Sequence, residues 1–325
     1  QPIFMMKQLI TVITPTFNEE ANVARCHAAV RDIFQAELPD CALEHIFSDN
    51  ASNDRTVEIL REICAGDSNV RAIVNRRNFG AERSMLNALR AARGNAVVVL
   101  LPADLQDPVE MIPKFVLEWR KGTKIVYGVR RGRRESFALK ACRKIFYRAV
   151  NRMAEFPIPR DVGEFQLIDR EVVEVLREFD DRRPYLRGMI ASCGFPGIGI
   201  EYTVAERKSG RSSMNFYRLV DIALNGLTSF SVVPMRLILA AGIIIATLAL
   251  AYSIISFLVT LIWFREFAQP GIATLIVGLF FFGGIQLFFL GVLGEYILSI
   301  HAQVRQRPLV IEAERINFKT DSGNS

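Results

Sequence analysis

The chain has 325 residues, of which 50% are hydrophobic and 23% are charged, and its formal net charge is +6. This apolar content excludes intrinsic disorder, and this charge content excludes a protein embedded wholly in a membrane. The modest positive charge requires no nucleic-acid partner, and we expect none. The apolar residues are concentrated in 235–300, where the charged side chains are Arg236, Arg265, Glu266 and Glu295.

The five cysteines have no paired spacing, and the three histidines are scattered along the chain. This usage predicts a reducing compartment, without a disulfide framework or a zinc site. No secretory signal opens the chain, so we expect the N-terminal part to stay in the cytoplasm.

Short apolar runs alternate with helical patterns from residue 7 onward, which is typical of an α/β fold with a mainly parallel sheet and helices on both faces. The predicted strands are Leu9–Thr14, Leu43–Phe47, Val70–Val74, Ala96–Leu101 and Lys124–Val129. The predicted helices are Glu20–Gln35, Asp54–Cys64, Ala81–Ala92 and Pro108–Lys121. We assign 7–213 to this domain.

Ligands of such sheets bind beyond the carboxyl ends of the strands, where three polar segments of this chain should converge. These segments are 14–19, 48–52 and 103–107. The chain lacks a GxGxxG after the first strand and lacks a GxxxxGK[ST] motif, which excludes the usual dinucleotide oxidoreductases and P-loop nucleotidases. A nucleotide site here must therefore rely on carboxylates and a metal.

Asp104 and Gln106 lie two residues apart after a predicted strand, so they should point to the same side. Two oxygen ligands suit Mg²⁺ or Mn²⁺, which commonly share substrate phosphates. An ordinary surface loop is the alternative, but the convergence of three polar segments favours a metal site.

Residues 124–152 are rich in Lys and Arg, with Glu135 as their acidic residue. Such a segment suits a solvated helix face, a lipid-headgroup patch or a phosphate site. Arg130 follows the fifth predicted strand, and its forked guanidinium suits phosphate oxygens.

Leu237–Phe264 and Phe267–Gly294 carry no charged side chain, and each exceeds the roughly 20 helical residues that cross a bilayer. Basic residues flank the pair on both sides, which predicts a multi-pass hairpin in 235–300 with both termini cytoplasmic. A buried soluble hairpin is the alternative. Glycines in the second run favour a homo-oligomer. Residues 301–325 are expected to form a cytoplasmic tail.

The segment 214–234 before the first apolar run is amphipathic and should lie at the membrane interface. Phe216 and Leu219 are its candidates for guiding a lipid tail, and a plain connector helix is the alternative.

Several motifs resemble the metal-dependent family 2 glycosyltransferases of GT-A fold. They are TPTFNEEANV (14–23), SDNASNDRT (48–56), NRRNFGAERSMLNALRAARG (75–94) and PADLQDP (102–108). Later motifs resemble the polyisoprenyl-phosphate branch, which is related to dolichol-phosphate mannose synthase, and the two spans resemble its GtrB type. These are GVRRGRRES (128–136), GEFQLIDR (163–170), YLRGMIASCGF (185–195), EYTVAERKSGRSS (201–213), LNGLTSFSVVPMR (224–236) and GEYILSIHAQVRQRP (294–308).

The resemblance implies transfer of a single sugar from a nucleotide-sugar to a polyisoprenyl phosphate at the cytoplasmic face of a bacterial inner membrane, by a homotetramer. It implies UDP-glucose as donor and undecaprenyl phosphate as acceptor, with mannose, galactose-type and aminosugar donors as alternatives. The implied nucleotide-sugar contacts are Pro15, Phe17, Glu19, Asp49, Asn50, Asn78, Ala103 and Asp104. The implied metal ligands are Asp104 and Gln106, and the implied acceptor-phosphate contacts are Arg130, Arg133, Arg207, Lys208 and Arg211.

The chain departs from the family pattern in three places. Pro102 replaces the first Asp of Asp-x-Asp, which leaves fewer carboxylates for a metal. In the Asp-Asp-Gly-Ser loop, the second Asp is Asn50 and the Gly is Ala51. Ser213 and Met214 replace a Lys and a Tyr, so that Arg211 or Lys208 would have to supply the phosphate-binding cation.

The acceptor's chemistry suggests a direct displacement with inversion. A phosphomonoester is mostly a dianion at pH 7 and needs little help from a general base. Stabilising the leaving diphosphate is the harder task, and it suits a metal and arginines. Asp161 and Glu164 are candidates for a base, for orienting sugar hydroxyls, for positioning Arg130 or for a structural role.

Two other functions remain open from the sequence. A processive polysaccharide synthase would carry a QxxRW motif, which neither Trp119 nor Trp263 belongs to. A membrane-bound nucleotide-sugar-binding subunit with a catalytically weak domain would agree with the changes at Pro102 and Ser213.

Overall fold

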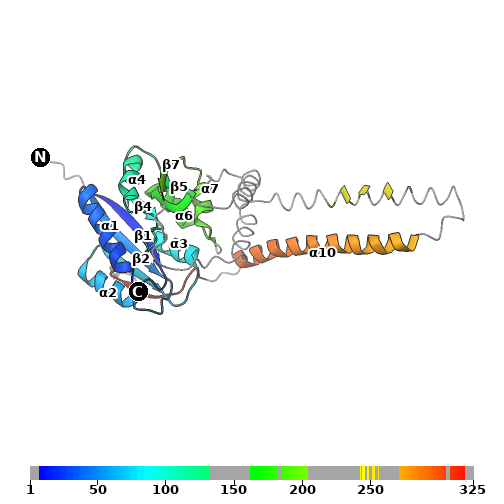
Figure 1. Ribbon diagram of the computed structural model, residues 1–325, viewed down its shortest axis with the longest axis horizontal. Helices are drawn as coiled ribbons and strands as arrows, with labels where there is room; N and C mark the ends of the chain where they lie inside the picture. The colour runs from blue at the N-terminus through cyan, green and yellow to red at the C-terminus, as the bar shows by residue number, and fades with distance from the viewer. Residues whose placement is uncertain are drawn as a thin grey trace. The chain divides into compact units, whose positions relative to one another are not determined.

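The computed structural model (Figure 1) describes residues 7–131, 162–181, 184–203, 271–304 and 308–318, together with single positions between 242 and 255. The chain divides into two compact units. The first comprises 1–145, 156–213 and 306–325, and the second comprises 146–155 and 214–305.

The described part of the first unit contains an eight-stranded sheet in the order β7-β5-β6-β4-β1-β2-β3-β8. The first five strands are β1 (Gln8–Thr16), β2 (Cys41–Asp49), β3 (Val70–Asn75), β4 (Ala96–Val99) and β5 (Ile125–Arg131). The last three are β6 (Val162–Asp169), β7 (Gly197–Thr203) and β8 (Glu312–Ile316). Strands β1 to β4 are mutually parallel, as are β5 and β7.

Six helices connect these strands within the described residues. They are α1 (Val23–Glu37), α2 (Thr56–Gly66), α3 (Ala81–Ala91), α4 (Met111–Arg120), α6 (Arg170–Glu178) and α7 (Leu186–Ser192). The sequence predicts the strands β1 to β5 and the helices α1 to α4, with ends that coincide or differ by up to three residues. The α/β class and the parallel centre of the sheet are confirmed.

The sheet is less parallel than expected at two places. Strand β6 runs antiparallel between β4 and β5, and β8 runs antiparallel to β3 at the edge. Neither strand was predicted. The antiparallel β6 carries Glu164 into the sheet between β4 and β5.

The core lies between the sheet and helices on both faces (Figure 1). Ile10 and Val12 of β1 face a cluster that includes Val30 of α1 and Phe115 of α4. Because side chains alternate along a strand, Ile13 points to the opposite face. Helices α3 and α6 contact the sheet as well. With both faces covered, the polar chemistry is left to the strand ends.

One buried carboxylate ties three segments of this sheet together. Glu44 of β2 is 3% exposed and forms an ion pair with Arg71 of β3. It also accepts hydrogen bonds from Thr11 Oγ1 (2.5 Å) and from the backbone N–H of Arg93 (2.8 Å). Each of its oxygens is therefore paired, as burial requires.

The C-terminal segment differs from its prediction as a tail, because residues 312–316 form β8 on the edge of the sheet. Glu314 pairs with Arg61 of α2 (2.7 Å), and Asn317 Nδ2 donates to the carbonyl of Val70 (2.6 Å). Ile316 packs against the cluster around Phe47 and Leu60. The described residues 308–318 thus belong to the first unit.

In the second unit, the structure describes the helix α10 (Gly271–Val304). Within the described part of the chain, no helix meets both the length and the hydropathy needed to cross a bilayer. The predicted run 237–264 lies almost wholly outside the described residues, and the predicted run 267–294 overlaps α10. Both runs stay predictions.

Candidate functional site

The loops after β1 and β2 are joined by reciprocal hydrogen bonds. The backbone N–H of Asn18 donates to Ser52 Oγ, and the backbone N–H of Asn53 donates to Asn18 Oδ1, both at 2.8 Å. Asn18 has φ 57°, a left-handed conformation that asparagine tolerates better than most residues. Phe17, next to Asn18, is 44% exposed. An exposed aromatic ring on a fixed loop is well suited to stacking on a nucleobase.

The buried side chain of Asp49 connects the end of β1 to the loop after β2. Its side chain is fully buried and accepts hydrogen bonds from Thr16 Oγ1 (3.1 Å), Ser52 Oγ (2.5 Å) and the Ser52 backbone N–H (2.9 Å). Ala51 has φ 64°, at the position where the family pattern has glycine. This left-handed conformation is sterically unfavourable for an alanine. The hydrogen bonds from Ser52 to Asp49, on either side of Ala51, hold it in place. A direct contact of Asp49 with the nucleotide stays a prediction.

Asn50 links the loop after β2 to the loop after β3. Its Nδ2 donates to Asn78 Oδ1 (3.0 Å), and its Oδ1 accepts from Asn75 Nδ2 (3.2 Å) and the Phe79 backbone N–H (3.0 Å). An aspartate could not make the first of these bonds because an ionised carboxylate has no donor. The asparagine that replaces the family's Asp therefore has a suitable partner here. Its bond to Asn78 places Asn78 at the same edge of the sheet as the loop after β2.

Glu19 lies where α1 approaches the loops. Its carboxylate accepts a hydrogen bond from Asn22 Nδ2 (2.6 Å), and its backbone N–H donates to Thr56 Oγ1 (2.9 Å). Arg25 of α1 reaches toward the loop after β4 and donates to the carbonyl of Asp104 (3.4 Å). The structure thus brings the three predicted polar segments to one edge of the sheet, as expected from parallel strands.

Asp104 and Gln106 contact each other in the loop after β4. Gln106 Nε2 donates to Asp104 Oδ2 (2.8 Å), and its backbone N–H donates to Oδ1 (3.2 Å). Both side chains are partly exposed, while Ala103 is buried behind them. Positive φ values at Leu100 (56°) and Leu105 (55°) shape the turn that sets them side by side. The two side chains lie together as expected, through a turn rather than the extended segment on which the prediction relied, and their role as metal ligands stays a prediction.

These two residues fit a divalent cation as part of a larger ligand set. A carboxylate and an amide oxygen are ligands that Mg²⁺ and Mn²⁺ accept. Among the described residues, no group of three or more His, Cys, Asp or Glu side chains lies close enough to hold a metal. Substrate phosphates and water would have to supply the remaining ligands, which is usual for Mg²⁺.

Arg130 lies on β5 beside two groups that sequence reasoning missed. Its Nη2 donates to Asp107 Oδ2 (2.7 Å), and its Nε donates to the hydroxyl of Tyr202 on β7 (3.0 Å). Asp107 belongs to the polar segment 103–107, but its spacing in the sequence predicted no function for it. Tyr202 gave no signal beyond its place in a short motif, because its use depends on how β5 pairs with β7.

Glu164 of β6 and Glu82 of α3 form a carboxylate pair near these groups. Burial, with a smaller contribution from the charge of Glu164, raises the pKa of Glu82 to about 7, against the opposing effects of the Leu186 backbone N–H and Arg187. Burial also raises the pKa of Glu164, while Arg187 and Arg130 lower it. Glu82 accepts a hydrogen bond from the Leu186 backbone N–H (2.9 Å). Its role was not predicted from the sequence.

Replacing Glu82 with glutamine should flatten the pH dependence of stability. A carboxyl whose pKa is higher in the folded than in the unfolded chain stabilises the fold fully below about pH 4.5, and loses that contribution as the pH rises through about 7. The wild-type melting temperature should therefore fall from pH 5 to pH 8 by more than that of Glu82→Gln.

The measurement is thermal unfolding across this pH range. Glu62→Gln, at an exposed position of α2, is the control and should follow the wild type. Parallel melting curves for wild type and Glu82→Gln would contradict the assignment.

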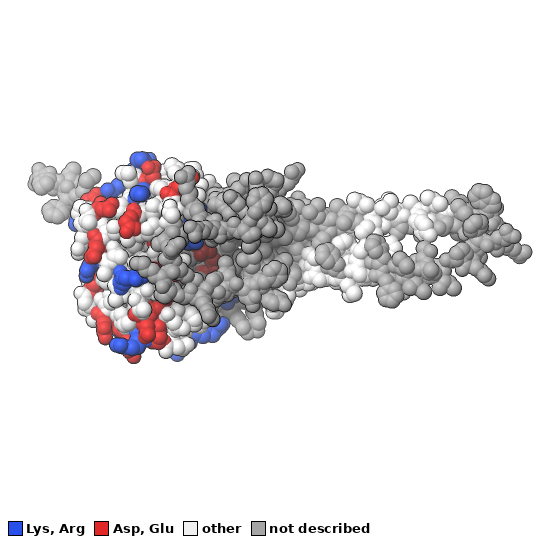
Figure 2. Space-filling view, viewed as in Figure 1, with Lys and Arg blue, Asp and Glu red and all other residues white. Residues whose placement is uncertain are grey.

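The remaining predicted site residues lie outside the described residues. They are Asp161, Arg133, Arg207, Lys208, Arg211, Phe216 and Leu219. Most of the basic segment 124–152 lies there too. Over the described surface of the first unit in the view of Figure 2, acidic and basic side chains are interspersed.

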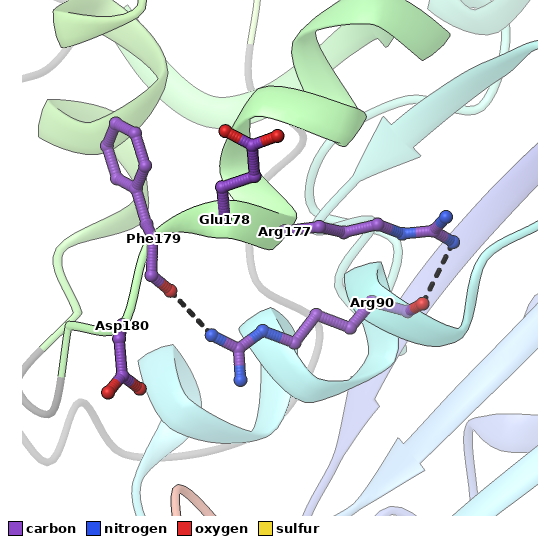
Figure 3. A pocket seen from close by; sticks show the side chains of 5 residues that line it. All are labelled: Arg90, Arg177, Glu178, Phe179 and Asp180. Carbon is purple, nitrogen blue, oxygen red and sulfur yellow. Dashed lines mark hydrogen bonds between the residues drawn. The ribbon is translucent and has the colours of Figure 1, made fainter.

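A cavity of about 540 Å³ lies elsewhere in the first unit, at the end of α3 (Figure 3). Its arginines serve as helix caps: Arg90 donates to the carbonyl of Phe179 (2.6 Å), and Arg177 donates to those of Arg90 (2.9 Å) and Ala92 (2.7 Å). Since α3 begins beyond the carboxyl end of β3, its last turn lies toward the opposite edge of the sheet. This cavity is therefore separate from the candidate site.

Comparison with known proteins supports the motif analysis. The glycosyl transferase family 2 model matches residues 11–177. The chain is 35% identical over 305 residues to the bactoprenol glucosyl transferase of Shigella phage SfII, covering 93% of this chain and 96% of that one. It is 33% identical over 302 residues to the uncharacterized glycosyltransferase YkcC of Bacillus subtilis, covering 93% and 92%.

Among solved structures, the chain is similar to the mannosyltransferase PcManGT from Pyrobaculum calidifontis, in complex with GDP-Man and Mn²⁺. It is 19% identical, with 94% of this chain and 89% of that chain covered and a TM-score of 0.47. The resemblance to polyisoprenyl-phosphate glycosyltransferases is confirmed by the relatives that span nearly the whole sequence. The chain belongs to glycosyltransferase family 2 and is a glycosyltransferase.

Proposed function

We propose that this enzyme transfers a single glucose from UDP-glucose to a polyisoprenyl phosphate such as undecaprenyl phosphate. The observation that carries this proposal is the similarity, at 32–35% identity over nearly the whole length, to bactoprenol glucosyl transferases of Shigella phages. The similarity extends beyond the family 2 match into the C-terminal third, which the soluble chemistry alone would not require.

The donor would bind at the edge formed by the loops after β1, β2 and β4. Phe17 offers an exposed ring for the base, and Pro15, Glu19, Asp49, Asn50 and Asn78 surround the same edge. Nucleotide binding here needs the loops to be ordered beforehand, because ordering them on binding would cost affinity. The bonds between Asn18, Ser52 and Asn53 supply that order.

A divalent metal, Mg²⁺ or Mn²⁺, would be held by Asp104 and Gln106 together with the donor's diphosphate. When bound, it would neutralise the charge that develops on the leaving diphosphate. The chain's own contribution is to hold these two oxygen-bearing side chains at one edge of the sheet, with the buried Ala103 packed behind them.

The acceptor phosphate would contact Arg130, with Arg133, Arg207, Lys208 and Arg211 as further candidates. A phosphate dianion is itself a competent nucleophile, and its attack on the sugar carbon would proceed in one step with inversion. Such a nucleophile has little need of Glu164 or Asp161 as a general base. The charges of Glu164 and Arg130 influence one another, which favours a role for Glu164 in arranging the site.

We further propose that the enzyme works at the cytoplasmic face of a bacterial inner membrane, with both termini in the cytoplasm. Large apolar side chains are exposed along α10, from Leu275 (71%) to Ile300 (61%), and such a surface calls for a lipid or protein partner. The apolar hairpin and the interfacial segment with Phe216 and Leu219 would keep the lipid acceptor near the site. A homo-oligomer through the hairpin, such as a tetramer, belongs to the same proposal.

The deciding experiment supplies purified full-length enzyme with Mg²⁺, undecaprenyl phosphate and a panel of radiolabelled nucleotide-sugars. A lipid carrying a single glucose, formed from UDP-glucose, is the expected product. A lipid carrying mannose or an aminosugar would show that the donor is another nucleotide-sugar than UDP-glucose. A polymer would indicate a processive synthase, and binding without turnover would indicate a nucleotide-sugar-binding subunit; either result would overturn the proposal.

A further inference from the structure

Three elements bring Asp107, Arg130 and Tyr202 into one hydrogen-bonded group. Asp107 follows β4, Arg130 lies on β5, and Tyr202 is the register partner of Arg130 on the parallel strand β7. The Tyr202 hydroxyl donates to Asp107 Oδ1 (2.5 Å) and accepts from Arg130 Nε (3.0 Å), while Arg130 Nη2 donates to Asp107 Oδ2 (2.7 Å). The three side chains thus close a triangle, which we call the arginine clamp.

Burial makes this clamp rigid. Asp107 is completely buried, Tyr202 is 6% exposed, and the Arg130 side chain is 26% exposed. Burial alone would lower the pKa of Arg130, but Asp107 and Tyr202 raise it, so its charge is secure. Burial and the adjacent Asp107 raise the pKa of Tyr202, which keeps its proton available as a donor.

The surrounding packing leaves the clamp little freedom to rearrange. A Cβ added at Gly128 of β5 would lie 2.5 Å from the Tyr202 ring, so only glycine lets the ring lie across this strand. The ring also meets Phe165 of β6 edge to face, with centroids 6.3 Å apart. The two hydrogen bonds engage Nε and Nη2 of Arg130, and Nη1 takes no part in the clamp.

We propose that Asp107 and Tyr202 are positioning residues, which fix the guanidinium of Arg130 so that its remaining N–H groups meet the phosphate of the lipid acceptor. This inference rests on the proposed function. A guanidinium binds phosphate best when its plane and charge are set beforehand, because fewer rotamers are then lost on binding. Asp107 and Tyr202 need not touch any substrate to have this effect.

The test compares a purely structural role with positioning by a double-mutant cycle. Tyr202→Phe removes both hydroxyl bonds and keeps the ring. In the full-length enzyme it should raise the KM for undecaprenyl phosphate about tenfold, the loss typical of a hydrogen bond to a charged group. The dissociation constant for UDP should stay within about twofold of the wild type.

The same substitution is then made in an Arg130→Ala background. If Tyr202 acts through Arg130, it should change KM there by less than about twofold. An equal tenfold effect in both backgrounds, or no effect in either, would overturn the proposal. Asp107→Asn supplies a second variant with the same expectation. Tyr127→Phe is the matched control, because Tyr127 lies on β5 with its ring against Gly197 and Gly199.

Equilibrium binding of undecaprenyl phosphate without donor separates this inference from the proposed function. If the wild type binds this lipid, and the Tyr202 and Arg130 substitutions weaken binding non-additively, the clamp is supported even where glucose is not the transferred sugar. If the wild type neither binds the lipid nor transfers a sugar to it, the proposed function fails and the clamp proposal fails with it.

Discussion

Replacing Asp104 with alanine should lower the rate of sugar transfer about 10³-fold. The change removes the carboxylate of the Asp104–Gln106 pair, and with Pro102 in place of the family's first Asp the pair has no second carboxylate to compensate. Losing electrostatic stabilisation of the leaving diphosphate costs about 4 kcal/mol, which corresponds to that factor. The rate is measured with UDP-glucose and undecaprenyl phosphate at saturating Mg²⁺.

A second measurement detects metal binding without requiring sugar transfer. Calorimetric titration of UDP into the wild type should show tighter binding with Mn²⁺ than with EDTA, and Asp104→Ala should remove that difference. The control is Glu110→Ala, at an exposed position before α4 in the same loop region. Near-normal transfer by Asp104→Ala would remove Asp104 from the metal site.

Replacing Glu44 with alanine should destabilise the first unit by about 3–5 kcal/mol, the usual loss when one member of a buried ion pair is removed. The variant leaves Arg71, Thr11 Oγ1 and the Arg93 N–H without their buried partner. For a unit of this size, the melting temperature should fall by roughly 6–20 °C. Thermal unfolding of the full-length enzyme measures the shift.

The matched control is Glu58→Ala on α2. Glu58 pairs with Arg55 at 3.3 Å, but both side chains are more than 60% exposed. Water screens such a pair, so its loss should change stability by less than about 1 kcal/mol. Equal shifts for Glu44 and Glu58 would show that burial does not decide the strength of these pairs.

Elements that obey one local rule could be predicted from the sequence. The strands β1 to β4 are apolar runs bounded by polar loops, and the helices between them have their apolar residues on one face. Their parallel order then placed Asn18, Asn50 and Asp104 at one edge, because the carboxyl ends of parallel strands lie together. Asp104 and Gln106 also lie side by side as expected, but a turn with positive φ at Leu105 brings them together, not the extended segment that the prediction assumed.

Features that depend on distant pairing could not be predicted. Asp107 and Tyr202 meet only because β7 pairs with β5, and β6 enters antiparallel between β4 and β5. The sequence offered Asp161 and Glu164 among the groups that could position Arg130. The structure shows Asp107 and Tyr202 bonded to Arg130, and Asp161 lies outside the described residues. Asn50 looked like a lost carboxylate, but its use as both donor and acceptor depends on Asn75 and Asn78 in the next loop.

The position of β8 beside β3 determines when this edge of the sheet can be completed during synthesis. Arg61 and Glu314 pair across 253 positions of sequence, so the edge of β3 stays open on the ribosome until residues 312–316 have been made. An open strand edge can pair with the wrong chain. A truncation that stops at the end of α10 would leave this edge open permanently, even though every residue of the donor loops would be present. β8 therefore closes this edge of the sheet only after the residues of the second unit have been made.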